Sequence, residues 1–300
     1  MGAICFCIKM ITWIASYPKS GNTWVRMLLS SILTGNDYDD SIDANLAVTG
    51  SDTSKELYQT LGIPLGSDSV KDRHGRLNSL YRANNKNKYI LKTHSANLGQ
   101  NTEVPLIPYD ITERAVIVVR NPLDTICSVM NHFGLNEEQA GALLTSPKSN
   151  LKESARQFSS LISSWDIFYD SWLDQSRPFP ILVIRYEDLH TDTVGCCERL
   201  CEFLCVEAYK KNISNAVKAN NFHLVKRSET NFGFKEQSEH SSSFFNKGEV
   251  GQFRGFLSDD LIDEVVQKLG KSMKKLGYDF NLDDRSFKLR NIQKSILPPV

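Results

Sequence analysis

The sequence lacks an excess of charge of either sign and has no apolar run long enough to cross a membrane. Its 300 residues carry 35 Lys and Arg against 35 Asp and Glu, so the formal net charge is zero. A protein dedicated to nucleic acid needs a basic excess to neutralise phosphates, so we expect no nucleic-acid partner. The longest apolar candidate, residues 4–15, is interrupted by Lys9 and Thr12. It falls short of the roughly 18 residues that a span needs, so we expect no membrane partner.

Features of secreted or lipidated proteins are also missing. Residues 4–15 have no basic leader and no small-residue cleavage site, and Phe6 stands where a myristoylation signal needs Ser or Thr. The cysteines number seven, and four of them recur at helical spacing without a CxxC or a pair of histidines: Cys196, Cys197, Cys201 and Cys205. This pattern predicts buried thiols rather than disulfides or a zinc site. We expect a cytoplasmic protein.

An alternation of short apolar strands and amphipathic helices fills most of the chain. The strands are expected at residues 11–17, 88–94, 113–120 and 180–186, and the helices at 24–33, from 122 onward, at 158–172 and at 259–276. This order predicts an α/β fold with a central parallel sheet flanked by helices, whose ligands bind at the carboxyl ends of the strands. No linker interrupts it. We expect a single domain over residues 1–300, in which 281–300 form a C-terminal tail.

Long segments with weak periodicity lie between these elements, at residues 36–87, 95–112, 134–152 and 229–246. Segments of this length are either substrate-binding elements or surface excursions without a role. Five aromatic residues are candidates for an acceptor pocket, although ordinary packing explains each of them equally well: Tyr81, Phe133, Phe232, Phe244 and Phe245.

Residues 16–23 (SYPKSGNT) connect the first strand to the first helix. Free backbone N–H groups and the helix dipole attract anions at such a junction. The segment has the outline of a Walker A loop, but Lys19 lies two residues before Gly21, and Asn22 occupies the usual lysine position. Gly21 and the amides that follow can hold phosphates, with Lys19 as a point charge and Thr23 as a hydroxyl donor. No expected strand ends in an acidic residue placed like a Walker B aspartate.

Two further expected strands end in residues whose side chains are typical of catalytic or anion-binding sites. Lys92 and His94 are two residues apart, so both point to the same side of their strand. A histidine pKa of about 6.5 is matched to general-base work at neutral pH. Arg120 ends the next strand, and Ser128 follows eight residues later. The other histidines have no comparable setting and are expected at the surface or in packing: His74, His132, His190, His223 and His240.

These segments resemble those of the cytosolic-type sulfotransferases, which use 3′-phosphoadenosine 5′-phosphosulfate (PAPS). Residues 17–24 are similar to the family's 5′-phosphosulfate loop, residues 120–128 to its 3′-phosphate segment and Lys92-Thr93-His94 to its catalytic strand end. Residues 246–253 are similar to a C-terminal segment written RKGxxGxW. The resemblance spans about residues 11–257 and implies the P-loop NTPase-like fold of the sulfotransferases.

The resemblance also implies roles for individual residues. His94 is the expected general base, and Lys19 and Lys92 are expected to stabilise the transition state. Trp24, Tyr186 and Phe222 would surround the adenine. The full expected nucleotide-binding set is Lys19, Ser20, Gly21, Asn22, Thr23, Trp24, Arg120, Ser128, Tyr186, Phe222, Asn246, Lys247 and Gly248.

This chain departs from the family pattern at three places. Asn246 stands where the family has an arginine that contacts the 3′-phosphate, and Phe253 replaces a tryptophan. Residues 256–259 do not reproduce the dimerisation motif of the animal enzymes, so the oligomeric state stays open. Asn22 and the compact length look more like bacterial members that act on small metabolites.

The sequence therefore predicts a sulfotransferase that moves the sulfuryl group from PAPS to a hydroxyl or amine of a small-molecule acceptor. The product is 3′,5′-adenosine bisphosphate (PAP), and no metal is expected to be required. A P-loop kinase or NTPase that uses Mg-ATP is the alternative, and a non-catalytic nucleotide-binding protein is a third reading. The acceptor itself is not specified by any pattern in the chain.

Overall fold

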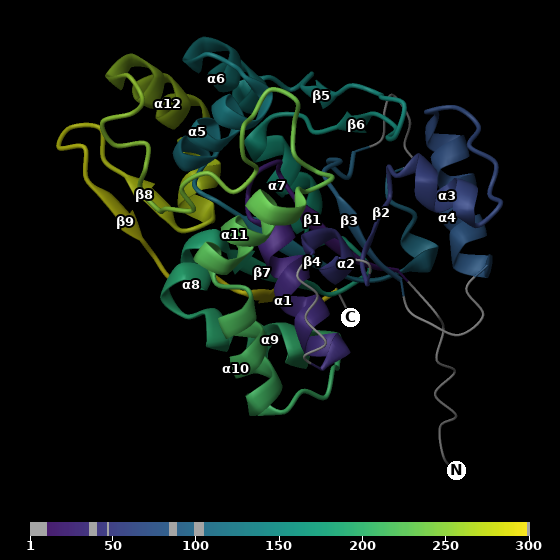
Figure 1. The fold of residues 1–300 in the computed structure, drawn as a ribbon. Coiled ribbons are helices and arrows are strands. Elements are labelled where there is room, and N and C mark those ends of the chain that lie inside the picture. The colour runs from purple at the N-terminus through teal and green to yellow at the C-terminus, as the bar shows by residue number, and fades with distance from the viewer. Residues whose placement is uncertain (1–10, 36–40, 47, 84–88, 99–104, 299–300) are drawn as a thin grey trace.

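The computed structural model describes residues 11–35, 41–46, 48–83, 89–98 and 105–298. In this part of the chain the central sheet has six strands in the order β10-β7-β4-β1-β3-β2 (Figure 1). The four inner strands are mutually parallel: β7 (Ile181–Arg185), β4 (Thr112–Val119), β1 (Ile11–Ser16) and β3 (Tyr89–Thr93). The edge strand β2 (Gly50–Ser51) is parallel to β3, whereas β10 (Ser295–Ile296) is antiparallel to β7.

The inner strands form where the sequence has short apolar runs because both faces of the sheet are covered. Trp13 and Ala15 of β1 pack in one hydrophobic cluster, and Ile14 between them packs in another on the opposite face. A strand buried on both faces needs apolar residues at successive positions, which is the pattern that these runs show. The predicted α/β fold is confirmed, and all four predicted strands are present within two residues of the expected ends.

Two groups of helices cover the sheet (Figure 1). One cluster contains residues of α1 (Asn22–Thr34), α9 (Thr193–Leu204) and α10 (Lys210–Ala219). The other contains residues of α5 (Pro122–Phe133), α6 (Glu137–Thr145), α7 (Trp165–Leu173) and α12 (Asp259–Lys275). None of the described helices is both long and apolar enough to cross a membrane.

Shorter elements complete the described chain. The helical ones are α2 (Ile42–Asn45), α3 (Lys55–Thr60), α4 (Val70–Ala83), the 3-10 turn η1 (Tyr109–Ile111), α8 (Tyr186–Thr191) and α11 (Phe222–Phe232). Two antiparallel pairs join β5 (Asn150–Leu151) to β6 (Ser160–Leu161), and β8 (Tyr278–Phe280) to β9 (Phe287–Leu289). The segment 281–300, which we predict as a tail, supplies β9 and β10.

Some expectations about local structure are wrong. The helix predicted over 158–172 begins at Trp165, because Ser160–Leu161 is a strand and Ser163 takes a left-handed φ of 58° before the helix. The segment 36–87 is not irregular, since it holds α2, α3 and α4. Three of the four helical cysteines are buried, as expected, but Cys205 is exposed because it follows the last turn of α9.

Candidate functional site

Residues that follow β1, β3 and β4 line a cavity of about 520 Å³. The three strands are parallel neighbours in the sheet, so their carboxyl ends meet at one edge. This arrangement brings together Lys19, Lys92, His94, Arg120 and Ser128, which come from separate parts of the sequence. Every residue of the predicted site lines the cavity except Ser20, which is fully buried and accepts a hydrogen bond from the Tyr169 hydroxyl at 3.2 Å.

The loop between β1 and α1 has the backbone geometry of an anion-binding turn. Lys19 and Gly21 have φ values of 65° and 99°, and Asn22 begins α1 directly afterwards. A Cβ on Gly21 would lie 2.6 Å from the Tyr186 ring, so only glycine fits there. The side-chain amide of Asn22 donates a hydrogen bond to the Ile14 carbonyl at 2.9 Å, which connects the loop to its strand. Residues 21–24 line the cavity, and the N–H groups at the start of a helix are suited to bind an anion.

Lys19 carries an ammonium group that is largely removed from water. Its Nζ lies 3.3 Å from the centroid of the Phe244 ring and 3.4 Å from the Phe244 carbonyl oxygen. Burial lowers the pKa of Lys19 to about 7, with repulsion from Arg120 and Lys92 acting in the same direction and attraction to Glu236 opposing it. No carboxylate of the described residues is ion-paired with Lys19, so an incoming anion would not have to displace one of them.

His94 is oriented by the strand next to its own. Its Nδ1 lies 2.8 Å from the Ser16 carbonyl oxygen, which can only accept, so Nδ1 carries the proton and Nε2 is the basic nitrogen. Burial lowers the pKa of His94 to about 4, and the charge of Lys92 adds to the effect. The imidazole is therefore neutral at physiological pH and able to accept a proton at Nε2.

Lys92 contacts a half-buried carboxylate that the sequence analysis did not single out. Its Nζ lies 2.6 Å from Glu236 Oε1, and the Arg26 guanidinium lies 2.9 Å from the same oxygen. The two cations hold the pKa of Glu236 far below its usual range, although burial acts in the opposite direction. Glu236 belongs to the segment 229–246, where no periodicity or motif could have marked it.

The other end of the cavity carries the guanidinium of Arg120, which lies over one aromatic ring. Arg120 donates to the Ser128 hydroxyl at 2.8 Å, to the Lys19 carbonyl at 3.2 Å and to the Glu249 carbonyl at 3.0 Å. Its guanidinium carbon lies 4.2 Å from the centroid of the Tyr186 ring. These contacts fix Arg120 and Ser128 side by side, so both can reach one anionic group.

Aromatic and glycine residues enclose this end. The Trp24 and Tyr186 rings meet edge to face with centroids 5.8 Å apart. A Cβ on Gly248 would lie 2.3 Å from the Phe222 ring, so the ring rests directly against the glycine backbone. Lys247 and Asn246 line the same wall, and the Asn246 carbonyl accepts a hydrogen bond from Lys226 at 2.8 Å.

Two histidines expected in packing or at the surface line the cavity as well. His190 packs against Trp24 with ring centroids 5.1 Å apart, and His132 packs against Phe244 at 5.5 Å. Burial lowers the pKa of His132 to about 3, so it is neutral. Of the candidate pocket aromatics, three line the cavity, namely Phe133, Phe244 and Phe245. Tyr81 instead packs on the core, and Phe232 is exposed.

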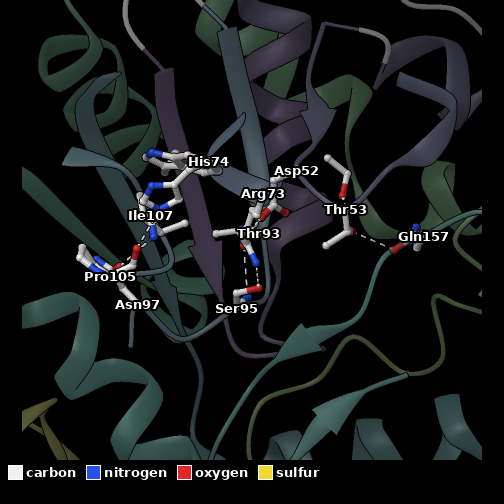
Figure 2. Close-up of polar contacts among 12 residues, drawn as sticks. Asp52, Thr53, Arg73, His74, Thr93, Ser95, Asn97, Pro105, Ile107 and Gln157 are labelled. Carbon is white, nitrogen blue, oxygen red and sulfur yellow. Dashed lines mark hydrogen bonds and ion pairs between the residues drawn. The ribbon is translucent and has the colours of Figure 1, made fainter. Parts of the chain in front are cut away.

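A buried polar network lies behind the strand end that carries Lys92 and His94 (Figure 2). Asp52 accepts hydrogen bonds from Arg73 of α4 and, at 3.0 Å, from the Thr93 hydroxyl. Arg73 also donates to the Ser95 hydroxyl at 3.0 Å. Both sequence neighbours of His94 are thus fixed to a single ion pair.

Comparison with known proteins identifies the family. The model of the sulfotransferase domain matches residues 10–277. Cytosolic sulfotransferase 17 from Arabidopsis thaliana is 23% identical over 291 residues, covering 89% of this chain and 75% of that protein. Flavonol 3-sulfotransferase from Flaveria bidentis is 24% identical over 281 residues, with 88% and 82% covered. Both relatives come from plants, and the likeness to bacterial members stays a prediction.

Two solved structures share the fold. Mouse sulfotransferase SULT7A1 in complex with PAP has a TM-score of 0.57 at 18% identity, covering 89% of this chain and 84% of that one. Retinol dehydratase in complex with androsterone and PAP also has a TM-score of 0.57 at 18% identity, with 88% and 80% covered. Because the family model matches most of its length, this chain belongs to the sulfotransferase family.

Proposed function

We propose that this protein transfers the sulfuryl group of PAPS to a hydroxyl or amine of a small-molecule acceptor. The observation that carries the proposal is one cavity that joins three parts: a cationic phosphate-type loop, a guanidinium–hydroxyl pair and a neutral histidine. The two solved structures with this fold are complexes with PAP, which supports the same nucleotide here.

The nucleotide would lie across the carboxyl ends of β1 and β4. Lys19 and the amides that start α1 would hold the 5′ end, where the sulfuryl group is attached. Arg120 and Ser128 would bind the 3′-phosphate, and this contact separates PAPS from ATP. Lys247 would add a charge on the same side. Trp24, Tyr186 and Phe222 offer aromatic surface to the adenine.

Sulfuryl transfer, by extension from phosphoryl transfer, passes through a loose in-line transition state. The bond between the acceptor atom and sulfur forms while the bond between sulfur and the bridging oxygen breaks, and PAP leaves with that oxygen. Negative charge grows on the bridging oxygen. We assign Lys19 and Lys92 as the cations that would stabilise this charge, and a contact of that kind is typically worth about 10²–10³ in rate. With these cations in place we propose that no metal ion is required.

The acceptor must lose a proton as it attacks. His94 Nε2 is the basic nitrogen of a neutral imidazole, because Nδ1 donates to the Ser16 carbonyl. We assign His94 as the general base that takes the proton. The relatives named cytosolic sulfotransferases support the cytoplasm as the place of the reaction.

The test combines nucleotide binding with turnover. Calorimetric titration with PAP in the presence of EDTA is expected to show binding, and labelled sulfate from PAPS is expected to appear on at least one member of an acceptor panel. His94→Ala is expected to lower turnover by about 10²-fold or more while PAP affinity stays within about threefold. His223→Ala changes an exposed histidine outside the cavity and serves as the control. A strong preference for Mg-ATP over PAP would favour the P-loop kinase, and an equal loss of affinity and turnover in His94→Ala would contradict the role of His94.

A further inference from the structure

The sheet order places a second wall of the cavity beyond His94. The nucleotide-binding segments follow β4 and β1, His94 follows β3, and the next strand along the sheet is the edge strand β2. Ser51 ends β2, Thr53 comes shortly after it, and both line the cavity. This part of the cavity therefore lies on the side of His94 away from Arg120, where an acceptor must approach.

The segment between β5 and β6 is attached to this place. The Lys55 amide donates to the Arg156 carbonyl and the Phe158 amide donates to the Thr53 carbonyl, both at 2.9 Å. The Thr53 hydroxyl donates to the Gln157 side chain at 3.2 Å, as Figure 2 shows. We call the polar lining residues of this region the acceptor wall: Ser51, Thr53, Lys152, Ser154, Arg156, Gln157 and Ser160.

The acceptor wall carries hydroxyls, an amide and two cations. Lys152 and Arg156 are exposed, and their side chains have no acidic partner among the described residues. Glu153 between them in sequence is paired instead with Lys55 at 2.5 Å. Elsewhere in the cavity Glu236 is neutralised by Lys92 and Arg26. Two further charged residues that line the cavity have opposite signs, Lys235 and Glu239.

We propose that the acceptor is a hydroxylated small molecule with an anionic group, and that Lys152 and Arg156 bind this group. The inference rests on the proposed function and specifies its substrate class. Two cations without acidic partners beside the acceptor approach attract a carboxylate or another anion. The Ser154 hydroxyl can donate to an acceptor hydroxyl, and the hydroxyl oxygens of Ser51 and Thr53, which are hydrogen-bonded to each other at 3.1 Å, can accept from one. An apolar acceptor would cover these polar groups without adding a hydrogen bond to them.

Two matched probes test the charge preference. 4-Nitrophenyl β-D-glucuronide and 4-nitrophenyl β-D-glucoside differ only at C6, which is a carboxylate in the first and a hydroxymethyl group in the second. Their binding to the PAP-saturated protein is measured by ligand-observed NMR at low salt. The glucuronide is expected to bind at least about fivefold more tightly, as one or two exposed ion pairs provide. The preference is expected to shrink as salt is added.

The Lys152→Gln/Arg156→Gln variant is expected to lose the preference while its PAP affinity stays within about twofold. Lys148→Gln/Arg227→Gln removes the same charge from exposed residues outside the cavity. This control variant is expected to retain the preference for the glucuronide. Equal affinities for the two probes, binding of neither probe, or a preference that survives in Lys152→Gln/Arg156→Gln would overturn the inference. PAP binding is measured separately, by titration into the same protein before any probe is added. If PAP binds while the probes fail, only the acceptor class is wrong, whereas failure of PAP to bind removes the proposed function as well.

Discussion

The ion pair behind the strand end that carries Lys92 and His94 gives the sharpest prediction about this site. Asp52 and Arg73 are 2% and 7% exposed, and their hydrogen bonds reach Thr93 and Ser95 on either side of His94. Arg73→Met removes the cation and leaves the Asp52 carboxylate buried without compensation. Breaking a buried pair in this way typically costs about 3–5 kcal/mol of stability.

The pKa of Asp52 shows why a double variant that removes both charges should be compared with Arg73→Met. Burial raises the pKa of Asp52 even though Arg73 attracts its charge, so desolvation is the larger effect. Removing both charges in Arg73→Met/Asp52→Asn should therefore cost less than removing Arg73 alone, and we expect it to recover about 2 kcal/mol. A raised folded-state pKa favours the protonated form in the folded protein. The deficit of Arg73→Met should accordingly be smaller near pH 5 than at pH 8, where Asp52 must ionise.

Urea unfolding followed by tryptophan fluorescence at both pH values measures these differences. Arg199→Met is the control, because Arg199 faces Asp192 at 3.8 Å in a largely exposed pair that should contribute less than about 1 kcal/mol. A loss below about 1 kcal/mol in Arg73→Met, or a double variant no more stable than the single one, would refute the reasoning.

Thr93 separates the role of this network in catalysis from its role in stability. Thr93→Val removes the hydroxyl that binds Asp52 and accepts the Ser95 amide at 3.1 Å, whereas Thr93→Ser keeps it. If the network positions His94, kcat should fall about tenfold in Thr93→Val with PAP affinity unchanged, and Thr93→Ser should restore it. Equal activity of the two variants would show that the network serves stability alone.

Three further outcomes follow from the same structure. Because the pKa of Lys19 is lowered to about 7, this side chain is mostly neutral at pH 8, and PAP binding should make it take up a proton. Calorimetry in two buffers of different ionisation enthalpy measures the uptake. Proton uptake that persists in Lys19→Met would contradict this assignment. Gly248→Ala places a Cβ against Phe222 at a φ of 66° and should weaken PAP binding about tenfold. Gly270→Ala should leave the affinity unchanged, because its Cβ would make only an ordinary contact with Val266 at 3.8 Å. Equal affinities of the two variants would be the contrary result. Glu236→Gln leaves Arg26 and Lys92 without their carboxylate and should lower the free energy of unfolding by about 3–5 kcal/mol. Glu239→Gln is the control and should change it little. Urea unfolding measures both free energies.

The sequence predicts well which residues meet at the end of the cavity that we propose for the nucleotide, because their determinants are local. Lys19, Gly21 and Arg120 each follow a strand whose apolar run is unmistakable, and parallel strands deliver their carboxyl ends to one edge. The hydrophobic pattern of the sequence locates such strands, and their parallel arrangement then brings the residues that follow them close together. The closeness of Arg120 to Ser128 follows from the strand and the helix after it. The surroundings of Lys19, by contrast, depend on Phe244, which is distant in sequence.

The acceptor side could not be predicted in the same way. Arg73 and Arg76 occupy the buried face of α4, so its apolar stripe is interrupted and the helix escapes a periodicity search. Their burial depends on partners far away in sequence, such as Asp52, which no local pattern encodes. Glu236 and His132 are similar cases, since each acquires its role only when loops and helices meet at the cavity.

The lowered pKa values of Lys19 and His94 have a common origin that bears on the order of events. Burial is the main cause for both, and neighbouring cations add to it. A histidine with a pKa of about 4 is a weak base, and a lysine with a pKa of about 7 holds its proton loosely. A nucleotide with phosphates at both ends of its ribose would add negative charge beside them and raise both pKa values. The donor itself would then strengthen the base and secure the charge on Lys19, so the site becomes fully competent for proton transfer only once the sulfuryl donor is in place.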